Sequence, residues 1–178
     1  MSASVSRGIP GARNVDHIAY TVPDLEEAID FFVDVLGAEL IYREGPVEDK
    51  TGDWMSRKLN VHPRASANIA MLRLGPVTNV ELFEYQAPDQ NRSLPRNSDH
   101  GGHHLAFYVD DVDAAAAYLR AQPGVRVLGD PETIQDGPLK GDRWVYFCAP
   151  WGMQMEVLNM PAGMPYEQQT TARRFGPC

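Results

Sequence analysis

The feature that most constrains this chain is an internal repeat. The stretch from His17 to Leu25 reads HIAYTVPDL, and the stretch from His104 to Val112 reads HLAFYVDDV. Both begin with a histidine, continue with the alternating side chains of a short strand, and reach an acidic turn before an amphipathic segment. Repetition of this kind predicts two similar supersecondary units within the 178 residues.

Each unit is predicted to contain one strand, one helix and three further strands. Asp24 and Asp111 stand where a helix N-cap is expected, and Gly37 is a natural helix stop. The helices are expected over residues 24–36 and 111–121, and the later strands over 38–44, 68–74, 80–85, 125–128, 143–148 and 153–158. The pattern predicts an α+β fold built from two tandem βαβββ modules.

The order of polar and apolar segments predicts the divisions of the chain. We expect a loose tail over 1–13, the first module over 14–86, a linker over 87–100, the second module over 101–160, and a C-terminal tail over 161–178 that wraps onto the body. The first module carries an insertion over 45–67, in which residues 54–59 predict one or two helical turns. Such insertions often cover sites. Residues 130–142 read as a loop.

Composition excludes several classes of function. A formal net charge of −8 argues against a nucleic-acid partner. No run approaches the roughly 18 apolar residues of a membrane span, and the N-terminus has no apolar leader core. Cys148 and Cys178 are expected to be free thiols. We therefore expect a cytoplasmic protein that acts on a small molecule. We also expect a homodimer, because two-fold symmetric dimers are the commonest oligomers.

Two histidines and two glutamates occupy equivalent places in the repeat. His17 and His104 lie on the first strands, Glu81 and Glu156 lie on the last, and all four face away from the predicted helix. If the sheets curve together, these side chains converge on one point. Two imidazoles and two carboxylates suit a divalent Zn, Ni, Co, Mn or Fe ion, and the absence of thiolate disfavours a purely structural zinc site.

The remaining histidines fit this set less well. Period two sends His103 and His104 to opposite faces, and the repeat selects His104 because His-Leu-Ala-Phe matches His-Ile-Ala-Tyr. His103 is then expected to support the site from a loop, if it contributes at all. His62 and His100 lie in predicted loops without a repeat partner, so we expect them at the surface.

At these residues the chain resembles the vicinal oxygen chelate superfamily, which includes glyoxalase I, methylmalonyl-CoA epimerase, extradiol dioxygenases, and fosfomycin-resistance and bleomycin-binding proteins. The resemblance covers residues 14–160. The motifs that carry it are VDHIAY from Val15, NVELF from Asn79, GHHLAF from Gly102 and QMEV from Gln154. The resemblance implies paired βαβββ modules whose curved mixed sheets surround a metal cleft.

The resemblance also implies a chemistry. We expect a metal-dependent isomerase, epimerase or lyase of the glyoxalase type, acting through a metal-stabilised enediolate, with Glu81 or Glu156 as the base. The alternatives are a non-haem Fe(II) extradiol-type dioxygenase and a drug-binding protein. Dioxygenases use two histidines and one carboxylate, so the second glutamate favours the first reading. Metal identity separates all three.

Overall fold

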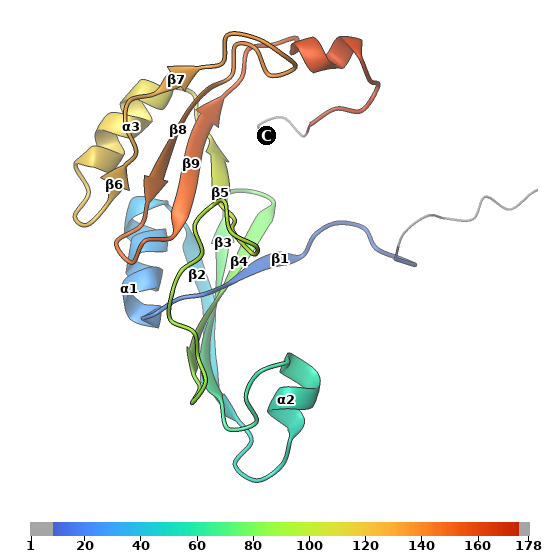
Figure 1. Ribbon diagram of the computed structural model, residues 1–178, viewed down its shortest axis with the longest axis vertical. Helices are drawn as coiled ribbons and strands as arrows, with labels where there is room; N and C mark the ends of the chain where they lie inside the picture. The colour runs from blue at the N-terminus through green and yellow to red at the C-terminus, as the bar shows by residue number, and fades with distance from the viewer. Residues whose placement is uncertain (1–8, 175–178) are drawn as a thin grey trace, which may run out of the picture. The chain divides into compact units, whose positions relative to one another are not determined.

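The computed structural model describes residues 9–174, and the chain divides into two compact units that meet between Pro88 and Asp89. Each unit contains a mixed sheet with few helices, which confirms the predicted α+β class (Figure 1). In each unit the first strand runs parallel to the last, and the other main pairings are antiparallel. Each unit is described by itself below.

The first unit is a four-stranded sheet in the order β1-β4-β3-β2 with helix α1 packed against β3 and β4. Its elements are β1 (His17–Thr21), α1 (Leu25–Asp30), η1 (Phe31–Val35), β2 (Glu39–Glu48), α2 (Trp54–Leu59), β3 (Ser66–Leu74) and β4 (Thr78–Gln86). Fully buried Leu72, Val80 and Leu82 form part of its core. The predicted helical turns in the insertion are confirmed as α2.

The first helix begins where the sequence predicts and then widens. The carboxylate of Asp24 accepts a hydrogen bond from the Glu27 amide at 2.9 Å, which is the expected N-cap contact. We expected one α-helix through Leu36, but the last turn is π-helical, with the Leu36 amide bonded to the Phe31 carbonyl. The wider turn accompanies burial of both Phe31 and its neighbour Phe32.

The second unit repeats the plan with a shorter and more divided sheet, in the order β5-β9-β8-β6, with β7 added beside β8. Its elements are β5 (Leu105–Tyr108), α3 (Val112–Arg120), β6 (Arg126–Val127), β7 (Glu132–Thr133), β8 (Arg143–Cys148), β9 (Gln154–Asn159) and η2 (Pro165–Gln168). Two expectations were wrong in detail. Strand β7 lies within the predicted loop 130–142, and β5 begins just after His104.

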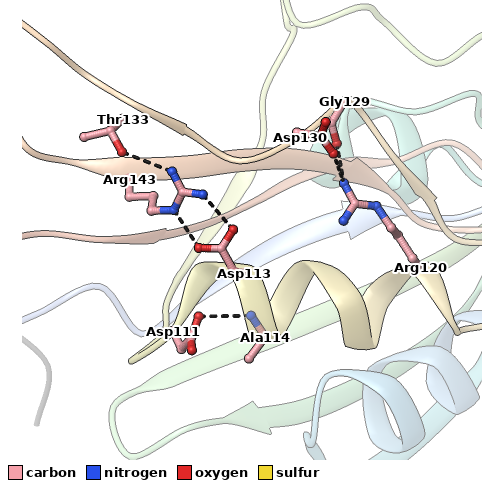
Figure 2. A network of polar contacts seen from close by, with 8 residues as sticks. All are labelled: Asp111, Asp113, Ala114, Arg120, Gly129, Asp130, Thr133 and Arg143. Atoms are coloured by element: carbon pink, nitrogen blue, oxygen red, sulfur yellow. Dashed lines mark hydrogen bonds and ion pairs between the residues drawn. The ribbon is translucent and has the colours of Figure 1, made fainter.

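Polar side chains tie helix α3 to the strands (Figure 2). The Arg143 guanidinium, from β8, donates to both carboxylate oxygens of Asp113 at 2.6 and 2.9 Å, and to the Thr133 hydroxyl at 3.1 Å. Near the other end of the helix, Arg120 donates to Asp130 at 2.8 Å. The contact with Arg143 gives two-residue β7 a side-chain link to β8, which explains a strand that periodicity does not reveal.

The C-terminal tail packs on the second unit, as expected. Met164 is 4% exposed, and the Tyr166 amide donates to the Pro138 carbonyl at 3.2 Å. Further along, Arg174 approaches Asp142.

Cys148 is a buried free thiol, whereas Cys178 lies outside the described residues. Between residues 9 and 174, helices are all too short or too polar to cross a bilayer.

Candidate active site

The first candidate pair lies on the adjacent parallel strands β1 and β4. Ala19 stands directly opposite Glu81, and His17, two residues earlier, projects from the same face as Ala19. The Nε2 atom of His17 lies 3.3 Å from Oε2 of Glu81. The small Ala19 side chain leaves room for this contact between imidazole and carboxylate.

The second unit repeats the pair on β5 and β9. Ala106 stands opposite Glu156, and His104 precedes it by two residues. Nε2 of His104 lies 3.1 Å from Oε2 of Glu156. The histidine side chain is 33% exposed and the glutamate 13%, so the carboxylate is largely withdrawn from water while the imidazole stays accessible.

In both pairs the far nitrogen of the imidazole is held by an oxygen. Nδ1 of His17 lies 3.0 Å from a carboxylate oxygen of Asp16, and Nδ1 of His104 lies 3.1 Å from the amide oxygen of Asn97. These oxygens only accept hydrogen bonds, so Nδ1 carries the hydrogen. In the neutral ring, Nε2 then carries no hydrogen and directs its lone pair at the glutamate. Metal-binding histidines have the same tautomer.

The donor set of each pair fits a divalent ion. An unprotonated Nε2 and a carboxylate oxygen are both electron-rich, and either a proton or a cation between them makes their contact favourable. Two ligand atoms about 2.1 Å from one ion, at a right angle, stand about 3.0 Å apart. Over residues 9–174 no three or more His, Cys, Asp or Glu side chains gather in a metal-binding group, so each unit alone offers two ligands.

The two pairs differ in their electrostatic surroundings. The hydrogen bond to Asp16 raises the pKa of His17; burial opposes this, and the negative charge of Glu81 adds to it. Burial raises the pKa of Glu156, against the opposing effect of His104, while the nearby charge of Asp142 adds to the rise. The second carboxylate therefore binds a proton more readily than an ordinary glutamate does.

Aromatic side chains flank both glutamates. In the first unit Phe83 and Tyr85 follow Glu81 on the same face of β4, and their rings stack with centroids 5.3 Å apart. In the second unit Tyr146 contacts His104 edge-on at 5.1 Å between centroids. Burial raises the pKa of Tyr146, Glu156 adds to the rise, and a hydrogen bond from Asn97 lowers it.

Two of the other histidines make local contacts. Nδ1 of His103 donates to the Gly101 carbonyl at 3.0 Å, and Nδ1 of His62 accepts from the Arg64 amide at 3.0 Å. The sequence predicts one metal set of four residues, whose members contact each other two by two within each unit, but it does not reveal the residues that hold the imidazoles. Asp16 could have been found as the neighbour of His17, whereas Asn97 comes from the stretch expected to be a linker and carries no periodic signal.

Comparison with known proteins identifies the family of the chain. Residues 16–147 match the family described as the Glyoxalase/Bleomycin resistance protein/Dioxygenase superfamily. A 2-epi-5-epi-valiolone epimerase from an Actinomyces species is 70% identical over 171 residues, 96% of this chain and 92% of the relative. An ethylmalonyl-CoA/methylmalonyl-CoA epimerase from Cereibacter sphaeroides is 30% identical, over 66% of this chain and 76% of the relative.

A solved structure shows the same fold at low sequence identity. The fosfomycin resistance protein FosX of Listeria monocytogenes, crystallised with Mn(II) and sulfate, has a TM-score of 0.54 at 18% identity, over 86% of this chain and 97% of that one. The relatives place the chain among enzymes of the isomerase or epimerase type, with a small-molecule substrate.

Proposed function

The chain belongs to the glyoxalase/bleomycin resistance protein/dioxygenase superfamily, and from this premise we propose that it is a divalent-metal-dependent epimerase of a small oxygenated ketone. The duplicated His–Glu pair is the observation that carries this proposal. Each imidazole has its Nδ1 hydrogen-bonded to an oxygen and its Nε2 directed at a carboxylate. Together the pairs offer both metal ligands and groups that move protons.

We propose that His17, Glu81, His104 and Glu156 bind one Zn, Ni, Co, Mn or Fe ion. When bound, such a cation polarises the carbonyl oxygen of a substrate. The hydrogen bonds of the two imidazoles support this assignment, because they fix the tautomer that a metal requires. The four ligands come from one chain or from two copies in a dimer, and the mass of the loaded protein in solution separates these arrangements.

Glu81 and Glu156 are the proposed proton-transfer groups. An epimerase inverts one carbon centre, so a proton leaves one face of the carbon and another arrives on the opposite face. A carbonyl beside that carbon makes its hydrogen acidic. Two carboxylates, one in each unit, allow one glutamate to remove the proton while the other returns one. Either assignment of these two roles agrees with the contacts within each unit.

The substrate proposal follows from the extent of similarity to one relative. Identity of 70% over nearly the full length of both chains supports the same reaction class and a closely similar substrate. We therefore propose 2-epi-5-epi-valiolone, or a cyclic ketone of the same kind, as the substrate. The stacked Phe83 and Tyr85 rings beside Glu81 offer an apolar surface for the carbon skeleton of such a molecule.

Metal analysis of protein purified without added metal tests the ligand assignment. We expect one ion per chain, loss of epimerase activity after chelation, and recovery on adding the ion back. His17→Ala and His104→Ala should each weaken binding of that ion. Two ions per chain, with one surviving in each variant, would show that the pairs act separately. Oxygen uptake with Fe(II) would instead support a dioxygenase, and a protein that binds no ion would support a drug-binding role.

Solvent deuterium exchange into the substrate tests the proton-transfer role. In D₂O we expect Glu81→Gln and Glu156→Gln each to slow exchange or epimerisation by about 10²- to 10⁴-fold, since general acid–base catalysis contributes about that much. Glu84→Gln is the matched control, because Glu84 lies on the opposite face of the same strand as Glu81. Natural exchange rates in both site variants would refute the assignment.

A further inference from the structure

Tyr146 of the second unit lies beside both His104 and Glu156. It lies directly opposite Glu156 in the antiparallel β8–β9 ladder, so both side chains project from the same face. Its ring also meets the ring of His104 edge-on, with the planes 73° apart and the centroids separated by 5.1 Å. Trp144, next along this face, also contacts the tyrosine ring edge-on, with the centroids 5.1 Å apart. One phenol therefore neighbours both members of the His–Glu pair.

Asn97 connects this phenol to the imidazole. Its amide oxygen accepts from Nδ1 of His104 at 3.1 Å, and its side chain lowers the pKa of Tyr146. The asparagine therefore neighbours both the imidazole and the phenol. Its contact with Nδ1 sets the tautomer of the imidazole that the phenol meets.

The first unit shows that the fold does not require a hydroxyl here. The residue opposite Glu81 in the β3–β4 ladder is Met71, which has no O–H to donate. In the first unit the charge of Glu81 raises the pKa of Tyr85, a phenol from the same strand, whereas in the second unit the phenol comes from the neighbouring strand and lies directly opposite Glu156. A hydroxyl that the strand pairing does not need points to a role in chemistry.

We propose that Tyr146 is a catalytic residue, whose hydroxyl donates a hydrogen bond to the substrate oxygen that gains negative charge when a proton leaves the adjacent carbon. This inference rests on the proposed epimerase function. The phenol stays intact, and no proton is transferred from it. Asn97 is a positioning residue that acts through the phenol. A fixed donor in a partly buried site stabilises a developing charge more than water does, because it needs no reorientation.

The test compares Tyr146→Phe with the natural enzyme on 2-epi-5-epi-valiolone in D₂O, following both deuterium exchange and epimer formation by proton NMR. We expect kcat to fall by about 10²-fold with little change in KM, because the bond strengthens as charge develops. Metal content should be unchanged, since the phenol is not a ligand. Tyr118→Phe, on the exposed side of α3, makes the same chemical change away from the pair and should keep natural activity.

Asn97 variants provide a second measurement. Asn97→Asp keeps an oxygen for His104, as Asp16 does for His17, but loses the amide N–H group that lowers the pKa of Tyr146, so kcat should fall while the metal stays bound. Asn97→Leu loses both contacts and should also weaken metal affinity, by about 10- to 100-fold. If the natural enzyme is active on this substrate and Tyr146→Phe has the same kcat, this inference alone is overturned. An inactive natural enzyme would overturn the proposed substrate and this inference together.

Discussion

Asp142→Asn should stabilise this protein. The residue is 4% exposed, and its Oδ1 atom has no hydrogen-bond partner among residues 9–174. Arg174 is the cation beside it, with Nη1 3.9 Å from Oδ2. Burial raises the pKa of Asp142, and the charge of Arg174 opposes that rise. The substitution replaces a poorly compensated buried charge with a neutral amide of nearly the same shape.

The expected gain follows from these contacts. A buried polar atom without a partner costs about 1–3 kcal/mol, and more when the group is charged, so the neutral amide removes the part that is due to charge. The ion pair that would be lost is long, and the Arg174 side chain is 44% exposed, so its loss costs under about 1 kcal/mol. The net increase in the free energy of unfolding at pH 7 should be about 1–2 kcal/mol. In a chain of this size each kcal/mol raises Tm by about 2–4 °C.

The gain should depend on pH in a defined direction. The pKa of Asp142 is higher in the folded chain than the value of about 3.9 expected when unfolded. The natural protein therefore suffers no penalty below the unfolded value, and loses stability as pH rises through the interval up to the folded pKa. The difference in unfolding free energy between variant and natural protein should vanish near pH 3 and be complete at neutral pH.

Urea denaturation at several pH values measures this difference. Asp136→Asn is the matched control, because Asp136 lies in the same loop and is exposed. It should leave the unfolding free energy nearly unchanged at every pH. If Asp142→Asn were less stable than the natural protein at pH 7, or if its gain did not depend on pH, the buried-charge explanation would be wrong.

Three further substitutions test the fold around the site. In Gly102→Ala the new methyl group would meet the backbone carbonyl oxygens of the preceding turn, which carries Asn97, so metal affinity should fall about 10- to 100-fold in a chelator competition assay. Asp111→Ala removes the hydrogen bond to the Ala114 amide and should cost about 1 kcal/mol in urea denaturation. Phe147→Ala empties a fully buried position and should cost about 3–5 kcal/mol, seen as a lower unfolding midpoint.

The repeat made the four residues of the two His–Glu pairs recognisable as one candidate set. Alternation along a strand puts His17 and Ala19 on one face, and the same spacing recurs at His104. Pairing of the first strand with the last then brings Glu81 and Glu156 to these histidines, as the ladders show. These contacts depend on local periodicity and on one strand pairing, and both leave a pattern in the sequence.

The supporting residues could not be predicted in this way. Asn97 reaches His104 from an irregular turn that is fixed by the Asp99 carboxylate, which accepts from the Arg96 amide at 2.8 Å. Asp142 is buried in a stretch read as a loop, beside which the C-terminal tail packs. Such contacts join segments without a shared period, so sequence pattern gives no signal for them. The same is true of two-residue β7, whose side-chain link comes from Arg143.

The hydrogen bond between Asn97 and His104 limits where the polypeptide can be divided. The stretch 89–100 looks like a spacer that could be lengthened, exchanged for a flexible sequence or cleaved anywhere. A break after residue 100 would leave the second half with a histidine ring that no longer has its oxygen acceptor. If the two halves are expressed separately, the chain should therefore be divided near residue 88, so that the turn containing Asn97 stays in the same fragment as His104.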